Sequence, residues 1–178
     1  MSETVVAGIV IPSTSAIFLA GVGVHVAFAL VAVAAGLGAM LSPKGLRRHR
    51  RFGRLYVWAL TGVVATAAAL ALARWAQDKA LFVLALIAFA AGWYGRWAQR
   101  RAWPGWVRHH IAAMGGSYVT MLTAFYVDNG RSLPIWRSLP TIAYWAVPSL
   151  VGAPIILAAM LRHPLAARPG RGPQGRTP

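Results

Sequence analysis

The histidines are the side chains in this sequence best suited to chemistry near neutral pH, and the 178 residues contain five of them. His49 lies within an arginine cluster, and His109 and His110 open an apolar run. Neutral imidazole ligates metals, and two imidazoles on separate helices are the minimum for a bis-histidine haem b. We therefore interpret His49, His110 and His109 as candidate haem b ligands. The alternative is that they are interfacial histidines that bind nothing.

Helical spacing separates the two adjacent histidines. If the run that they open is one helix, His109 shares a face with Thr120, whereas His110 shares a face with Met114 and Ser117. One histidine then faces the helix bundle while the other faces its rim. The positive end of the helix dipole and the nearby arginines both favour the neutral, ligating form of imidazole.

A dense set of cations surrounds His49, and it predicts contacts with anions. Guanidinium groups suit haem propionates and anionic lipid head groups equally well. The members that we assign to lipid or anion contacts are Arg47, Arg48, Arg50 and Arg51.

A second possible site brings together His25, Asp128 and Tyr126. Counting helical rises places His25 and Asp128 at similar depths near the other membrane edge, which suggests a proton or ion site. A carboxylate at a helix C-terminus is disfavoured by the dipole, so Asp128 is expected to pair with His25, Arg131 or Arg137. The alternative is that the Asp-Asn-Gly sequence at this point is only a turn that ends the helix.

Other catalytic constellations are missing from the sequence. Its acids are Glu3, Asp78 and Asp128, too few and too far apart for a paired-carboxylate or Ser-His-Asp site. There is no cysteine, no HExxH zinc motif and no glycine-rich phosphate loop. The sequence thus offers no hydrolytic or transferase constellation, and if the protein is an enzyme we expect at most an electron-transfer protein.

The composition indicates which elements hold these residues. Hydrophobic residues make up 58% of the chain and the mean hydropathy is +0.57, values typical of membrane proteins. The net charge of +15 comes from short clusters between long neutral runs, which argues against nucleic-acid binding. We predict an all-α, polytopic transmembrane bundle of about five helices. The apolar runs are 16–41, 52–73, 80–97, 109–128 and 141–161.

Charge asymmetry predicts the orientation of the bundle in the bilayer. With five helices, fourteen of the eighteen Lys and Arg residues fall on one side, and cytoplasmic loops carry that excess. The N-terminus is then outside and the C-terminus cytoplasmic, in a cytoplasmic (inner) membrane. The predicted parts are an N-terminal segment (1–15), a single transmembrane bundle (16–161) and a disordered basic tail (162–178).

A family resemblance rests on a set of motifs. These are His25, His49-Arg50-x-x-Gly53-x-x-Tyr56 and His110-x-x-x-Met114. Over roughly residues 25–161 the chain resembles a bacterial family of predicted multi-span membrane proteins, domain of unknown function 2306. The family pattern has Trp before the Met, where this chain has Ala113. The resemblance implies a helix bundle, adds weight to His25, His49 and His110, and implies no substrate.

Three functional hypotheses remain open. The first is a redox membrane protein that binds haem b or interacts with quinone through His49 and His110. The second is a cofactor-free accessory or assembly subunit, whose basic loops hold anionic lipid or an acidic partner among other membrane subunits. The third is a small proton-coupled carrier that uses His25 and Asp128.

Overall fold

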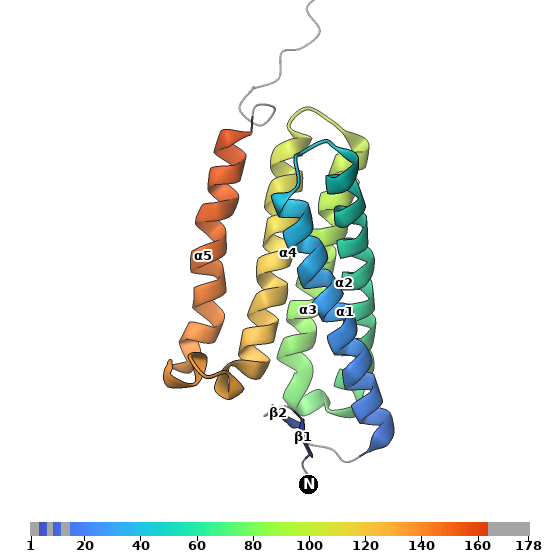
Figure 1. Cartoon of the computed structure of the whole chain (residues 1–178), viewed down its shortest axis with the longest axis vertical. Helices are drawn as coiled ribbons and strands as arrows, with labels where there is room; N and C mark the ends of the chain where they lie inside the picture. Colours follow the sequence, from blue (N-terminus) through green and yellow to red (C-terminus); the bar gives the residue numbers. More distant parts are fainter. Residues whose placement is uncertain (1–3, 7–8, 12–14, 164–178) are drawn as a thin grey trace, which may run out of the picture.

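The computed structural model describes residues 4–6, 9–11 and 15–163, and within them it confirms a five-helix bundle (Figure 1). Successive helices run in opposite directions, joined by short connections. Two short strands precede the first helix and pair antiparallel, with Val5 opposite Val10. The elements are β1 (Thr4–Val6), β2 (Ile9–Ile11), α1 (Ala16–Leu41), α2 (Arg47–Ala73), α3 (Trp75–Arg101), α4 (Trp106–Asn129), the 3-10 helices η1 (Gly130–Ser132) and η2 (Trp136–Ser138), and α5 (Thr141–Arg162).

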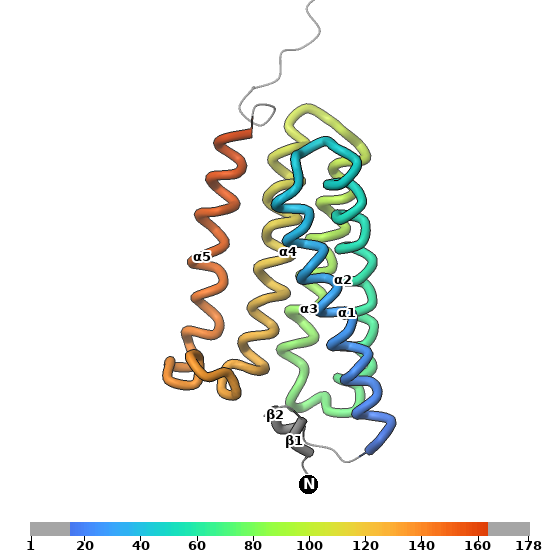
Figure 2. The backbone as a smooth tube through the Cα atoms, in the orientation of Figure 1, coloured from blue at the N-terminus to red at the C-terminus, as the bar shows by residue number. Residues whose placement is uncertain are grey.

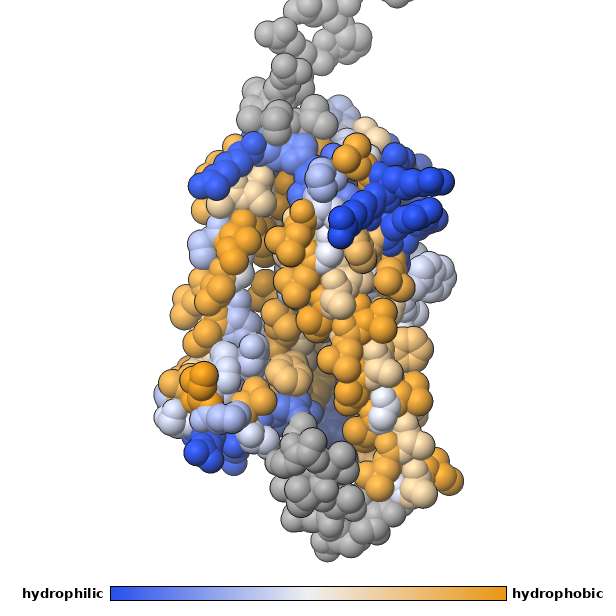
Figure 3. All heavy atoms as spheres, in the orientation of Figure 1, coloured by the Kyte–Doolittle hydropathy of each residue, from blue (hydrophilic) through white to orange (hydrophobic). Residues whose placement is uncertain are grey.

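Four helices, α1, α2, α3 and α5, are long and apolar enough to cross a membrane. Large apolar side chains cover their outer surfaces, among them Leu30, Leu86 and Ile155 (Figure 3). The protein is therefore a multi-pass membrane bundle.

Helix α4 does not reach the same hydropathy, although the sequence predicted it as a span. Helix α4 packs between α3 and α5, so it can carry more polar residues than a helix that faces lipid (Figure 2). Its polar residues Ser117 and Thr123 are buried among neighbouring helices, where a hydroxyl finds partners that lipid does not supply.

The bundle has two chemically different ends. At the basic end, α1, α3 and α5 finish and α2 and α4 begin, and cationic side chains gather there (Figure 3). At the opposite end lie the starts of α1, α3 and α5, together with η1 and η2. This separation gives the two predicted sites different surroundings.

Small residues allow the helices to pack closely in the centre. A Cβ placed on Gly36 of α1 would meet the rings of Tyr118 and Tyr56, and one on Gly62 of α2 would meet Phe28. Close approach through small residues is how membrane helices gain van der Waals contact. The largest fully buried side chains are Tyr56, Leu60, Val57 and Ser117.

Helices α2, α3 and α4 extend beyond the predicted apolar runs. Helix α2 begins at Arg47, so His49 lies in its first turn rather than before it. Helix α3 spans Trp75–Arg101 instead of 80–97, and α4 begins at Trp106 instead of 109. Asp78 lies in the first turn of α3 and approaches Arg74 to 3.9 Å, which favours a helix start there.

The final helix, α5, runs continuously through two prolines, Pro148 and Pro154. Prolines are tolerated in membrane helices where neighbouring groups satisfy the freed carbonyls. Residues 164–178 of the predicted disordered tail lie outside the described part of the chain.

Candidate functional site

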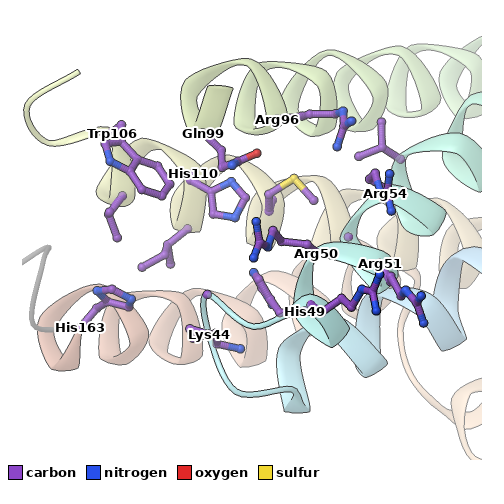
Figure 4. Close-up of a pocket in the computed structure, with 17 residues that line it drawn as sticks. Lys44, His49, Arg50, Arg51, Arg54, Arg96, Gln99, Trp106, His110 and His163 are labelled. Atoms are coloured by element: carbon purple, nitrogen blue, oxygen red, sulfur yellow. The ribbon is translucent and has the colours of Figure 1, made fainter. Parts of the chain in front are cut away.

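A cavity of about 800 Å³ opens at the basic end of the bundle. Its walls come from α2, α3, α4, the turn between α1 and α2, and His163 just after α5 (Figure 4). His49 and His110 both extend into it, from α2 and α4. Residues that are distant in the sequence thus line one cavity.

The two histidines meet across this cavity. Their ring centroids lie 6.3 Å apart and the rings are inclined at 76°. His49 Nδ1 lies 2.9 Å from the carbonyl oxygen of Ala39, and His110 Nδ1 lies 2.9 Å from that of Gly95. A carbonyl only accepts, so each Nδ1 donates its hydrogen. In the neutral imidazole, Nε2 is then the nitrogen with a lone pair, and the carbonyl fixes the ring's orientation.

The turn between α1 and α2 brings His49 to the cavity. Gly45 adopts a positive φ of 82°, which a residue without a Cβ accepts readily. Lys44 Nζ donates to the carbonyl of Ala39 at 3.2 Å, the carbonyl that also accepts from His49. Partial burial lowers the pKa of Lys44. The C-terminal carbonyls of α1 therefore anchor both cationic and imidazole groups.

Close contact between α3 and α4 sets the position of His110. A Cβ on Gly95 would lie 2.9 Å from Met114 Cγ and 3.2 Å from Ala113 Cβ. Only a residue without a side chain allows this approach, and the approach brings the Gly95 carbonyl within hydrogen-bond distance of His110.

His109 lies outside the cavity. Its Nδ1 is 2.9 Å from the hydroxyl of Tyr94, and its ring packs against Trp103 at 5.5 Å. Trp97 joins this aromatic cluster. Of the adjacent pair, His110 thus faces the bundle and His109 the rim, as helical spacing predicted for one of each.

Cations dominate the lining of the cavity. The described acids, Asp78 and Asp128, both belong to the opposite end of the bundle. Of the four arginines predicted to contact anions, Arg48 does not line the cavity and its guanidinium lies over the ring of Phe52 at 5.7 Å. The cationic side chains that line it are Lys44, Arg47, Arg50, Arg51, Arg54 and Arg96.

The predicted site at the opposite end is not assembled within the described residues. His25 Nδ1 lies 2.9 Å from Thr66 Oγ1, and Asp128 accepts from Asn129 Nδ2 at 3.2 Å. The cation that acts on Asp128 electrostatically is Arg74, rather than Arg131 or Arg137. Tyr126 stacks on Trp136 with centroids 3.8 Å apart. Each group has local partners, and they do not converge.

Sequence reasoning missed several cavity residues. Arg54 lies one helical turn after Arg50 and Arg51, so its position on the same face was predictable from α2 alone. Arg96 and His163 reach the cavity from α3 and from the end of α5, and predicting them requires knowing which helices are neighbours.

Metal binding by protein ligands alone is not supported in the described part of the chain, which contains no group of three or more His, Asp or Glu suited to a metal ion. A pair of imidazoles is nevertheless a complete axial set for haem. No family model, no curated protein and no solved structure matches this chain. The resemblance to domain of unknown function 2306 therefore stays a prediction.

Proposed function

We propose that the protein is a haem b-binding, electron-transferring membrane protein, with His49 and His110 as the axial ligands. The observation that carries this proposal is the convergence of these two rings in one cavity, 6.3 Å apart. Two imidazoles on separate helices are the minimum set that would hold a haem b. This pair would supply both ligands from one cavity.

The anchoring of the rings also fits ligation. Metal-bound histidines usually donate their other ring N–H to a carbonyl or carboxylate, which fixes the tautomer. Both His49 and His110 do so through Nδ1. Nε2 is then the ligating nitrogen on each ring.

The cavity has room and charge for the rest of the group. Gly53 lines the wall one helical turn after His49, and a Cβ there would meet no atom within 4 Å. Arg47 and Arg50 line the same cavity and would pair with propionate carboxylates, for which guanidinium is a strong bidentate partner.

Haem b, when bound, supplies a one-electron couple. The chain's own residues set its surroundings. His49 and His110 would hold the group, and Val57, Ile111 and Met114 form an apolar wall that would limit water. The surrounding cations would favour the more negative, reduced state.

We further propose that the basic end faces the cytoplasm of a bacterium, in its inner membrane. Lys and Arg collect in the cytoplasmic loops of membrane proteins, and the cations here concentrate at one end of the bundle. The N-terminus is then outside, and the haem site lies at the cytoplasmic edge.

Haemin titration of the purified protein tests the proposal. We expect wild-type protein to bind haemin with the visible spectrum of a six-coordinate b haem. His49→Ala and His110→Ala should each weaken binding by at least tenfold, because each removes an axial ligand.

His109→Ala is the matched control, since it removes the neighbouring imidazole of the same helix from outside the cavity. It should bind haemin as wild type does. A protein that stays colourless after haemin is added, or equal losses in all three variants, would refute the proposal.

A further inference from the structure

Two arginines lie deeper in the bundle than the other cations of the basic end. Arg54 is seven residues after the start of α2, about 10 Å along the helix, and Arg96 is five residues before the end of α3, about 8 Å. Both are therefore at similar depth. Both line the cavity, on the side away from Trp106 and His163, and their side chains approach each other from the two helices (Figure 4).

These two charges oppose each other. Arg96 is half-buried on α3 and Arg54 is exposed on α2, and like charges repel. The described carboxylates, those of Asp78 and Asp128, are at the far end of the bundle. Cations held together inside the membrane edge are costly unless an anion joins them.

We propose that Arg54 and Arg96 form a binding site for a phosphate-type anion. Two planar guanidinium groups that approach from different helices match a tetrahedral oxyanion, because each can donate two hydrogen bonds to it. The site uses other residues of the same cavity than the histidine pair, and it does not depend on haem.

An anionic phospholipid is one source of the phosphate, and free inorganic phosphate is the other. Basic pockets between membrane helices bind the head groups of anionic lipids. The apolar surface of the bundle begins next to the hydrophilic basic end, so a head group bound there would keep its acyl chains in the bilayer (Figure 3).

The test uses haem-free full-length protein in neutral detergent at constant ionic strength. Thermal unfolding is followed while phosphatidylglycerol, phosphatidylcholine or inorganic phosphate is added. A ligand that binds only the folded protein raises its unfolding temperature in proportion to occupancy. We expect phosphatidylglycerol or inorganic phosphate to raise it, and phosphatidylcholine to have little effect.

Paired variants assign the effect to the site. Arg54→Gln/Arg96→Gln should lower the affinity for the stabilising anion at least tenfold. Arg48→Gln/Arg101→Gln removes the same charge from the same two helices outside the cavity and should change the affinity less than twofold. Arg54→Lys/Arg96→Lys keeps the charge and should still weaken binding, because lysine lacks the bidentate fork.

The outcomes distinguish a lipid head group from free phosphate, and they distinguish the anion proposal from the haem proposal. Stabilisation by phosphatidylglycerol but not by inorganic phosphate identifies a lipid head group; stabilisation by both identifies the phosphate itself. Equal losses in the two glutamine pairs, or no response of wild-type protein to either anion, would overturn the proposal. Haemin binding by Arg54→Gln/Arg96→Gln should persist, so this result is independent of the haem proposal.

Discussion

Both ends of the bundle contain ionisable side chains, but among the described residues these side chains share a cavity only at the basic end. At the basic end, His49 and His110 come from separate helices, each held by a backbone carbonyl, and share one cavity. At the opposite end, His25 bonds to Thr66 of the neighbouring helix and Asp128 to the adjacent Asn129. The presence of ionisable residues in a membrane bundle is therefore not sufficient for a binding site; their side chains must also lie close together.

Convergence is what distinguishes the basic end. His25 contacts the hydroxyl of Thr66 and the backbone of Val63, both in the neighbouring helix, and these contacts satisfy a buried group and contribute to helix packing. Two histidines with oriented rings, facing a cavity lined by cations, leave their Nε2 atoms available to a ligand. The predictions below test this contrast, from the largest expected effect to the smallest.

Gly95→Val should have the largest effect. Its side chain would displace Met114 and Ala113, and the α3 carbonyl would move away from His110. We expect at least a tenfold loss of haemin affinity, together with a stability loss of about 1–3 kcal/mol from overpacking. Haemin titration and thermal unfolding measure the two effects. Gly23→Val is the control, because a Cβ on Gly23 meets nothing within 4 Å; an equal effect there would contradict the positional role of Gly95.

Arg50→Gln should lower the midpoint potential of the bound haem. Removing a cation from the cavity wall weakens the preference for the reduced state. We expect a decrease of about 60 mV or less, since 59 mV corresponds to a tenfold change for a one-electron couple. Redox titration gives the value. Arg131→Gln removes the same charge at the opposite end and should leave the potential unchanged; equal shifts would mean that the haem is not at the basic end.

Tyr56→Phe tests the buried core that joins the two ends. The Tyr56 hydroxyl lies 2.7 Å from Ser117 Oγ, which also donates to the carbonyl of Ala88 at 2.7 Å. Removing the hydroxyl should cost about 1 kcal/mol of stability, because Ser117 keeps its second partner. Thermal unfolding is the measurement, and haemin binding should stay within twofold of wild type. A loss of haemin binding with intact stability would give Tyr56 a role in the site.

His25→Leu should have the smallest effect. It removes the bond to Thr66, which keeps its own bonds to the carbonyls of Gly62 and Val63. Side-chain hydrogen bonds between membrane helices contribute about 0.6 kcal/mol on average, so a loss of that order is expected in thermal unfolding. Haemin affinity should not change. A tenfold loss of haemin binding would show that His25, and not the basic end alone, supports the site.

The sequence predicted most of the fold, because hydropathy and charge act locally. The five runs and the basic clusters between them follow directly from composition along the chain, although α2 and α3 are longer than the runs predicted for them. The start of α3 was missed because the charged Asp78 lowers the local hydropathy and so excludes this segment from the apolar run. Its pairing with Arg74 in fact supports a helix start.

The site was predictable only in part. Helical faces separated His110 from His109, and the arginines near His49 indicated an anion. The positions of Arg96 and His163 in the cavity could not be predicted from the sequence. They depend on the contacts of α3 with α2 and on where α5 ends. The bond between Tyr56 and Ser117 joins residues 61 positions apart, which no local pattern encodes.

The spin state of the bound haem tests the central claim most directly, since it reports how many axial ligands the iron has. We expect a six-coordinate, low-spin signal in the electron paramagnetic resonance spectrum of the oxidised wild-type protein. His49→Ala and His110→Ala should each convert it to high spin, with added imidazole restoring low spin, and His109→Ala should leave it unchanged. Low-spin haem that persists in both His49→Ala and His110→Ala would contradict the account.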